Sequence, residues 1–374
     1  KFAFNGLSSV ETYNIADTVT DIAAWGIDTQ SAKTFNVGSS KSFTVDEGVL
    51  MTADGKTLIA YPGGADEVDE YEVPSTVGTI AAGAFVGCDA TKIVIPETVT
   101  SFPQWSFAGS TTEELEFNAS VATIKRGTFS GLSSLKSLVF GSTTLGEIEE
   151  QSCINLSSLT EITFPDSLTT IGAQAFKVLS TDGAATPNLK KVTFGKNVSV
   201  IADQVFLCQS ALEAIDMTRC EKLTNVGNFS GSGYGGSSII YTNTPVVYTA
   251  NEDDAKLAKK TNDNRVIYAV TNGGTFSDDT TFTAGTLAEP SKPNYNFDGW
   301  YEDAEFNTQV TTVTAGRIYY AKWAKKTVIS NDCSATAQDN VRWGLTENGN
   351  GTYTLTISGT GNMADYTQPN KPNA

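Results

Sequence analysis

One pattern of apolar residues recurs along the chain from residue 79 to residue 226. Each copy has an aliphatic or aromatic anchor, four intervening positions and then phenylalanine or a substitute for it, as in TIAAGAF at 79–85 and TIGAQAF at 170–176. The anchors are 22 to 30 residues apart, and a loop-like insertion at 180–187 accounts for the longest separation. They are Ile80, Phe102, Ile124, Ile148, Ile171, Ile201 and, in a weaker copy, Val226. A recurring period of this length is typical of proteins built from stacked repeats.

A short alternating segment precedes each anchor, as in KIVIP at 92–96 and EITFP at 161–165. Alternation of apolar residues with others over four or five positions predicts a short strand with one buried face. A single unit of this size cannot bury its own apolar face, whereas stacked units bury a continuous core and pair their strands. We therefore expect a β-rich solenoid of right-handed stacked coils with short parallel strands, and with the isoleucine and phenylalanine anchors in its core.

The fullest copies of the pattern resemble a known repeat. PSTVGTIAAGAFVGC at 74–88 and PDSLTTIGAQAF at 165–176 are similar to the consensus of the BspA-like (Treponema-type) leucine-rich repeat. The resemblance covers residues 1–245, and Cys153 departs from it by standing in place of the phenylalanine. It implies a leucine-rich repeat protein that is secreted by a bacterium or held at its surface, with a role in adhesion to host protein, matrix or other cells.

We expect the array to occupy residues 1–265 and to carry two additions. A hairpin insertion near 45–62 also resembles an insert of this family, and its Asp54-Gly55 pair is a strong two-residue turn signal. A helix near 252–260 is expected to cap the array, because its sequence, EDDAKLAKK, places acids at the start and lysines at the end, as the helix dipole favours.

The remaining sequence differs in pattern from the array. Residues 266–325 contain the segments GWY and YAKW, which resemble the Listeria–Bacteroides repeat of bacterial surface proteins and imply a small α+β module of the β-grasp-like class. Residues 326–374 alternate across an Asn-Gly-rich turn, so we expect a C-terminal β-hairpin fragment, which would be a partial β module.

Composition excludes several classes of function. The chain has 25 Lys and Arg against 42 Asp and Glu, a net charge of −17, and contains no histidine. An acidic chain of this kind is a poor partner for nucleic acid or for anionic lipid, since both are bound mainly through Lys and Arg. Without histidine there can be no Ser-His-Asp triad and no His-ligated zinc. No apolar run reaches the length of about 18 residues that a membrane-spanning helix needs.

The five cysteines give no metal or redox motif. Their number is odd and no C-x-x-C pair is present. We expect small buried thiols, with a bridge between Cys208 and Cys220 in adjacent coils as the alternative.

The alternating strands also predict a candidate binding surface. If the apolar residues of each strand point inward, the residues between them form a row on the outer face of the array. That row is Glu72, Val94, Glu116, Val139, Thr163, Thr193 and Asp216. Repeat arrays commonly bind partners on such a continuous face. Valine and threonine bordered by carboxylates suit a protein or glycan partner, and the alternative is a solvated sheet that binds nothing.

Three hypotheses about function remain open at this point. The first is an adhesion or binding protein whose partner is a host protein, a matrix protein or a glycan, with no catalytic residue, no cofactor and no metal ion. The second is a carbohydrate-binding accessory protein or a carboxylate-based glycoside hydrolase, since acidic pairs such as Glu113-Glu114 are present, although catalysis depends on their separation in space. The third is a structural spacer.

Overall fold

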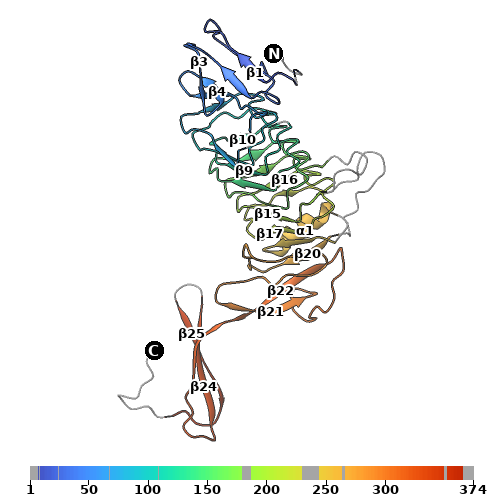
Figure 1. Ribbon diagram of the computed structural model, residues 1–374. Helices are drawn as coiled ribbons and strands as arrows, with labels where there is room; N and C mark the ends of the chain where they lie inside the picture. The colour runs from blue at the N-terminus through green and yellow to red at the C-terminus, as the bar shows by residue number, and fades with distance from the viewer. Residues whose placement is uncertain are drawn as a thin grey trace.

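The chain forms a long stack of coils that ends in a smaller, separate sheet (Figure 1). This computed structural model describes residues 7, 9–23, 25–66, 68–107, 109–178, 187–229, 244–262, 266–348 and 352–364. The insertion expected at 180–187 therefore lies outside the described residues, apart from its last position.

The N-terminal coils carry the first two sheets. Two strands pair in parallel, β1 (Thr12–Asn14) with β2 (Thr34–Asn36). A meander of three antiparallel strands follows, β3 (Phe43–Asp46), β4 (Val49–Thr52) and β5 (Thr57–Ala60). The turn between β4 and β5 contains Asp54 and Gly55, and Gly55 adopts a left-handed conformation with φ of 67°. This meander joins the array because β5 pairs in parallel with β7 (Thr79–Ile80).

Most coils of the array contribute a longer strand and a two-residue strand, and in the coil of β8 an isolated bridge between Thr79 and Ser101 stands in place of the two-residue strand. The longer strands are β6 (Glu70–Glu72), β8 (Lys92–Ile95), β9 (Glu114–Phe117), β11 (Ser137–Phe140), β13 (Glu161–Thr163), β15 (Lys191–Thr193), β17 (Ala214–Met217) and β19 (Val246–Thr249). After β7, the two-residue strands are β10 (Thr123–Ile124), β12 (Glu147–Ile148), β14 (Thr170–Ile171), β16 (Val200–Ile201) and β18 (Asn225–Val226). All pairings within the array are parallel, which confirms the predicted solenoid of short parallel strands.

The core of the stack is a ladder of phenylalanines with aliphatic residues beside it. Rings of successive coils are in contact, with centroids 5.0 Å apart for Phe85 and Phe107 and 6.1 Å apart for Phe176 and Phe206. The anchor residues are buried as expected, and Cys153 is fully buried at the position of the missing phenylalanine. All five cysteines are free thiols, so Cys208 and Cys220 are not bridged in this structure.

The sheet of two-residue strands is unbroken, whereas the longer strands form two separate sheets. The two-residue strands form one unbroken sheet, in the order β10-β12-β14-β16-β18. The longer strands divide into β11-β9-β8-β6 and a second sheet that starts at β13, and no ladder joins β11 to β13 in the part of the chain that the structure describes. The break lies beside a coil that is one residue longer between its two strands. In that coil the buried strand residue Leu138 precedes the anchor Ile148 by ten positions. In the next coil Ile162 precedes the anchor Ile171 by nine.

Helix α1 (Glu252–Thr261) covers the end of the array. The side chain of Asn251 caps it by accepting a hydrogen bond from the backbone N–H of Asp254 at 2.9 Å. Acidic residues occupy its first turn and lysines its last, which complements the helix dipole. Its buried face presents Ala255 and Ala258 to the array core.

The sheet does not stop at residue 265, where we expected the array to end. It continues from β19 through β20 (Ile267–Val270) and β22 (Ile318–Lys325) to β21 (Tyr295–Tyr301). The first two of these pairings are parallel, as in the array, and only β21 and β22 are antiparallel. The segment that resembles a separate module is therefore joined to the solenoid by backbone hydrogen bonds.

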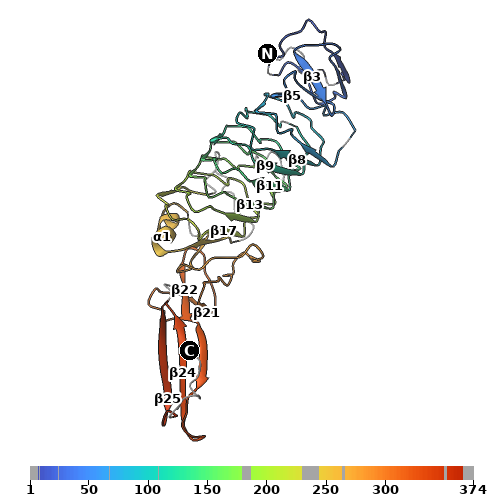
Figure 2. The same ribbon diagram turned by 90° about the vertical axis from the view of Figure 1, so that its left-hand side faces the viewer.

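The C-terminal sheet stands apart from the stack in both views (Figures 1 and 2). It has three antiparallel strands, β23 (Thr327–Asp332), β24 (Asn340–Glu347) and β25 (Tyr353–Thr360). The expected hairpin corresponds to β24 and β25, and β23 adds a third strand to it. Leu355 and Ile357 on β25 are more than half exposed.

Candidate functional site

The predicted outer row lies on one side of the stack, on the longer strands that Figure 2 shows one below another. Strand register places Glu72 beside Val94, Val94 beside Glu116 and Glu116 beside Val139. After the break between the two sheets, Thr163 lies beside Thr193. These six residues are exposed or half-buried, and we call the surface that they form the strand face.

Asp216, the seventh predicted residue, is not part of the strand face. It lies in register with Thr193 but only 4% of it is exposed, so the expectation that it is accessible to a partner is wrong. The reason is the packing of segment 276–288 over the end of the sheet. The neighbour of Asp216 on β19 is Tyr248, whose ring centroid lies 4.7 Å from that of Phe276 and 5.3 Å from that of Phe282.

Asp216 instead makes hydrogen bonds within the protein, beneath segment 276–288. Its Oδ1 accepts hydrogen bonds from the backbone N–H and the hydroxyl of Thr218, at 2.9 and 2.7 Å. Burial raises the pKa of the Asp216 carboxyl, and the two bonds from Thr218 oppose that rise only in part.

We expect Asp216→Asn to stabilise the fold at pH 7 and to do so less at pH 4. A raised pKa in the folded state means that burial penalises the charged carboxylate, so the wild-type protein loses stability as the pH rises from the ordinary aspartate range through the folded pKa. The asparagine oxygen can still accept the bonds from Thr218 without carrying charge. Thermal unfolding of both proteins at the two pH values measures the difference, and a variant that is less stable than wild type at pH 7 would contradict the prediction.

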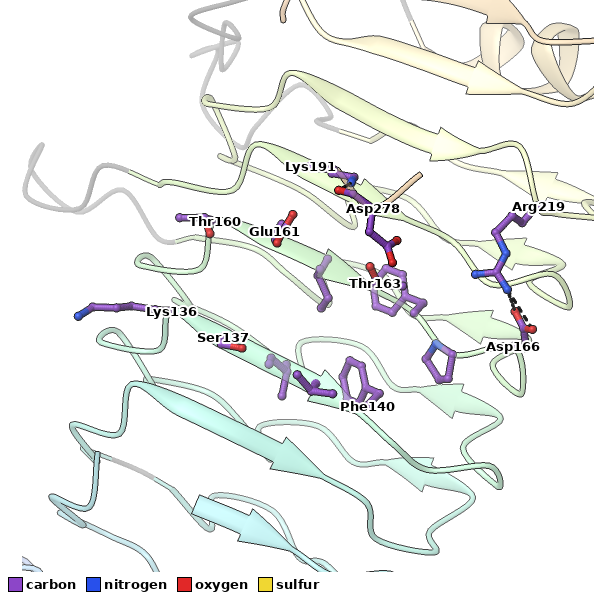
Figure 3. Close-up of a pocket in the computed structure, with 15 residues that line it drawn as sticks. Lys136, Ser137, Phe140, Thr160, Glu161, Thr163, Asp166, Lys191, Arg219 and Asp278 are labelled. Atoms are coloured by element: carbon purple, nitrogen blue, oxygen red, sulfur yellow. Dashed lines mark hydrogen bonds and ion pairs between the residues drawn. The ribbon is translucent and has the colours of Figure 1, made fainter. Parts of the chain in front are cut away.

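A groove of about 500 Å³ opens on the strand face where β11 and β13 are not paired (Figure 3). Val139, which is 52% exposed, and Thr163 are among the residues that line it. Its charged residues are three basic and three acidic: Lys136, Lys191, Arg219, Glu161, Asp166 and Asp278. The groove therefore combines apolar and hydroxyl groups with charges of both signs.

Contacts between distant parts of the chain fix two sides of this groove. The Nη2 of Arg219 donates to both carboxylate oxygens of Asp166, at 2.8 and 3.1 Å, as the dashed lines of Figure 3 show. Lys191 donates to the backbone carbonyl of Asp278 at 3.4 Å, and its Nζ lies 5.3 Å from the ring centroid of Phe282. Asp166 and Arg219 are 53 residues apart, and Lys191 and Asp278 are 87 residues apart. Neither pair joins adjacent coils, so the pattern of a single repeat did not predict these contacts.

A second groove, of about 410 Å³, lies at the other end of the strand face. Its lining includes the carboxylates Glu72, Glu97 and Glu116, and none of the described residues that line it is basic. Glu116 accepts a hydrogen bond from the side-chain amide of Asn118 at 2.9 Å. This end of the strand face is therefore acidic.

The one lysine on the strands beside this acidic groove is already paired. Lys92 Nζ lies 2.8 Å from Glu70 Oε1. The bond to Glu70, and more weakly the charges of Glu116 and Glu114, raise the pKa of Lys92. Its positive charge is therefore offset by the carboxylates around it.

The described residues lack two kinds of feature. They contain no group of three or more Cys, Asp or Glu side chains that could hold a metal ion. Their helical residues do not include a segment long and apolar enough to cross a membrane.

Comparison with known proteins supports the repeat. Residues 64–181 match the family described as the BspA type leucine rich repeat region, in six copies. The match does not reach residues 266–325, so the resemblance of that segment to the Listeria–Bacteroides repeat stays a prediction. No curated protein matches the chain significantly.

Similar solved structures include bacterial leucine-rich repeat proteins. One from Eubacterium ventriosum is 23% identical, with 61% of this chain and 63% of that chain aligned and a TM-score of 0.39. The pneumococcal vaccine antigen PcpA is 18% identical over 70% of this chain and 56% of its own, with a TM-score of 0.43. A leucine rich cell surface protein from Faecalibacterium prausnitzii is 15% identical over 64% of this chain and 73% of its own, with a TM-score of 0.27.

The aligned region thus spans less than two thirds of the first two of these chains. The array of the present protein is a leucine-rich repeat solenoid, and its repeats at residues 64–181 are similar to the BspA type.

Proposed function

We propose that this protein binds another protein through its strand face, at the surface of a bacterial cell or after secretion from it. The observation that carries the proposal is the strand face itself, on which six side chains from successive coils are accessible in two in-register groups. An outer face built from successive coils is the usual binding surface of repeat arrays. The proposal assigns no catalytic residue.

The charges of the strand face favour a partner with a basic surface. Glu70, Glu72, Glu114 and Glu116 outnumber Lys92 on the first three strands, and the chain as a whole carries a net charge of −17. Complementary charge accelerates association and disfavours partners of like sign. A host or matrix protein that presents lysine and arginine fits this surface, and a nucleic acid or a sulfated glycan does not.

Apolar groups on the strand face would provide the contacts that hold such a partner. Val139 is 52% exposed and lies beside the open groove between β11 and β13. Burial of apolar side chains at the centre of an interface supplies most of its binding energy, while surrounding charges mainly set specificity. The groove would thus receive an apolar side chain of the partner, with Glu161 and Lys191 at its rim.

The location outside the cell rests on the repeat type. The BspA-like resemblance implies a protein of the bacterial surface, and residues 64–181 match the corresponding family.

The double substitution Thr163→Arg and Thr193→Arg should strongly weaken binding without destabilising the fold. Thr163 lines the groove and Thr193 lies beside it on the next strand, so arginines at both positions would obstruct this part of the strand face and repel a basic partner. The assay is biolayer interferometry of the full chain against a panel of purified extracellular-matrix proteins, with thermal unfolding of each variant. We expect at least one matrix protein to bind the wild-type chain, and the double variant to bind it about a hundredfold more weakly, as for loss of a central contact.

The control is Thr354→Arg with Thr356→Arg, which makes the same changes on the exposed strand β25 of the C-terminal sheet. This control should bind as the wild-type protein does. Equal binding by the strand-face variant and the wild type would show that the partner docks elsewhere.

A further inference from the structure

A row of residues in left-handed conformation runs along the side of the stack where the two-residue strands lie. It has one member in each of seven coils, and its φ angles lie between 56° and 79°. The members are Trp25, Gly83, Trp105, Gly127, Gln151, Gln174 and Gln204. We call them the left-handed row. It follows strands β7, β10, β12, β14 and β16, whereas the strand face lies on the longer strands, so the two are different surfaces of the stack.

We propose that Trp105, in this row, is the stacking platform of a second binding site, which takes a neutral polysaccharide chain. Tryptophan at this position costs conformational free energy. Its φ of 59° is a conformation that residues with a side chain adopt at a cost in free energy and that glycine adopts freely. Glycine does occupy the same position in neighbouring coils, at Gly83 and Gly127, so the backbone does not require tryptophan here.

Trp105 carries a second cost as well, because 42% of this large apolar residue is exposed. Exposed single apolar residues are common on proteins, but coincidence of exposure with an unfavourable backbone conformation is not. Residues held in such conformations cluster at functional sites. The combination therefore points to a role for this ring in binding.

The ring of Trp105 is held flat. A Cβ placed on Gly127 would lie only 2.7, 2.8 and 3.0 Å from the indole atoms Cε2, Cζ2 and Cδ2. Three similar distances mean that the indole lies face-on over Gly127, and only glycine leaves room for it. The backbone N–H of Trp105 also donates to the carbonyl of Gly127 at 3.2 Å. The ring is therefore fixed before any ligand arrives, which lowers the entropy cost of binding.

Trp25 repeats this arrangement nearer the N-terminus. A Cβ on Gly83 would lie 2.8 Å from its Cε3 and 3.0 Å from its Cζ3. The array thus packs an indole over the glycine of the next coil at two places.

Polar groups continue the site from Trp105 along the stack. Arg126 precedes Gly127, and its Nη2 donates to Oε1 of Gln151 at 2.6 Å. From there the side-chain amides form a ladder, in which Gln151 donates to Gln174 at 3.2 Å and Gln174 donates to Gln204 at 2.7 Å. Each amide has two N–H groups and an oxygen with two lone pairs, so each keeps hydrogen-bonding capacity for a ligand.

A sugar ring matches this arrangement in its chemistry. One face of a pyranose consists of C–H groups that pack on an indole, and its rim consists of hydroxyls that bond to amides and guanidinium groups. Successive rungs of the row are about 4.8 Å apart, so the track offers repeated polar contacts to an extended chain. The ligand should be neutral, because the chain carries a net charge of −17 and Glu150 lies 3.7 Å from the guanidinium of Arg126.

The test is affinity electrophoresis of the full chain in gels that contain a mixed-linkage β-glucan, an arabinoxylan, a galactomannan or a yeast mannan. We expect at least one of these polysaccharides to retard the wild-type protein. Trp105→Gly should bind that polysaccharide about tenfold more weakly, as for loss of one stacking contact. Glycine relieves the backbone strain of this position but removes the packing of the indole over Gly127. Thermal unfolding of both proteins is therefore measured as well, and retardation is compared at a temperature at which both are folded.

Two controls separate this site from the rest of the molecule. Leu355→Ala removes a comparably exposed apolar residue from strand β25 and should leave retardation unchanged. The strand-face variant Thr163→Arg with Thr193→Arg should also be retarded like the wild type, so this proposal and the proposed function can fail independently. Absence of retardation by all four polysaccharides, or equal retardation of Trp105→Gly and the wild type, would overturn the proposal.

Discussion

Replacing Phe176 with alanine should lower the free energy of unfolding by about 3–5 kcal/mol. Phe176 is only 1% exposed, and its ring centroid lies 5.4 Å from that of Phe164 and 6.1 Å from that of Phe206. The substitution leaves a cavity in the middle of the phenylalanine ladder. The backbone N–H of residue 176 would keep its bond to the carbonyl of Val205, so the loss belongs to the side chain alone.

Urea denaturation followed by circular dichroism measures this loss, and hydrogen exchange shows where it is felt. Because each coil contacts only its neighbours, amides in the coils of Phe164 and Phe206 should lose protection before those of distant coils. Val139→Ala is the control, since Val139 is 52% exposed and its truncation should change stability by no more than about 0.5 kcal/mol. A loss below about 1 kcal/mol for Phe176→Ala would mean that this ring does not support the core.

Tyr248→Ala should cost a similar amount, about 3–5 kcal/mol, and should also uncover the end of the strand face. Tyr248 is fully buried, and its ring packs against Phe276, Phe282 and Trp300. Its hydroxyl accepts a bond from the backbone N–H of Ala288 at 3.0 Å. Tyr248 thus anchors segment 276–288, which lies over Asp216 and β17.

Hydrogen exchange should detect this uncovering as faster exchange in 276–288 and in β17. Tyr248→Phe is the matched control, because it keeps the ring and removes only the hydroxyl. It should cost about 0.5–1.5 kcal/mol, the range for loss of a typical hydrogen bond, because Ala288 is half-buried, and should keep segment 276–288 in place. Unchanged exchange in this segment for Tyr248→Ala would show that other contacts hold it.

The proposed function and the second site make different use of the same repeat. The strand face uses the residues that alternate with the core on the longer strands, and the left-handed row uses the turns on the side of the stack where the two-residue strands lie. Both surfaces run along the stack, so each can engage an extended partner over several coils. A protein partner at one surface and a polysaccharide at the other would not compete.

The sequence alone was enough to predict the solenoid and most of the strand face. The reason is that the contacts that define them are local in the repeat. Ile162 and Ile171 are buried, and Thr163 is exposed, because of alternation within one coil, and each coil pairs with the next one along the chain. The same alternation and the same pairing occur in successive copies, so the period of the sequence predicts the stacking of the coils.

The sequence did not predict the left-handed row. Glycine at 83 and 127 gave a local hint of an unusual conformation, but tryptophan and glutamine share the position without sharing any property that a pattern could detect. Only the backbone angles group Trp105 with Gly127 and Gln151.

The burial of Asp216 and the composition of the groove were decided by tertiary structure. Asp216 alternates with the core as Thr193 does, yet it is covered because segment 276–288 folds back over β17. Lys191 and Asp278 meet across 87 residues, and no period relates them. Such contacts depend on where an irregular segment packs once the stack exists. The sequence therefore determined the array and its outward rows, whereas long-range packing decided which part of each row stays open.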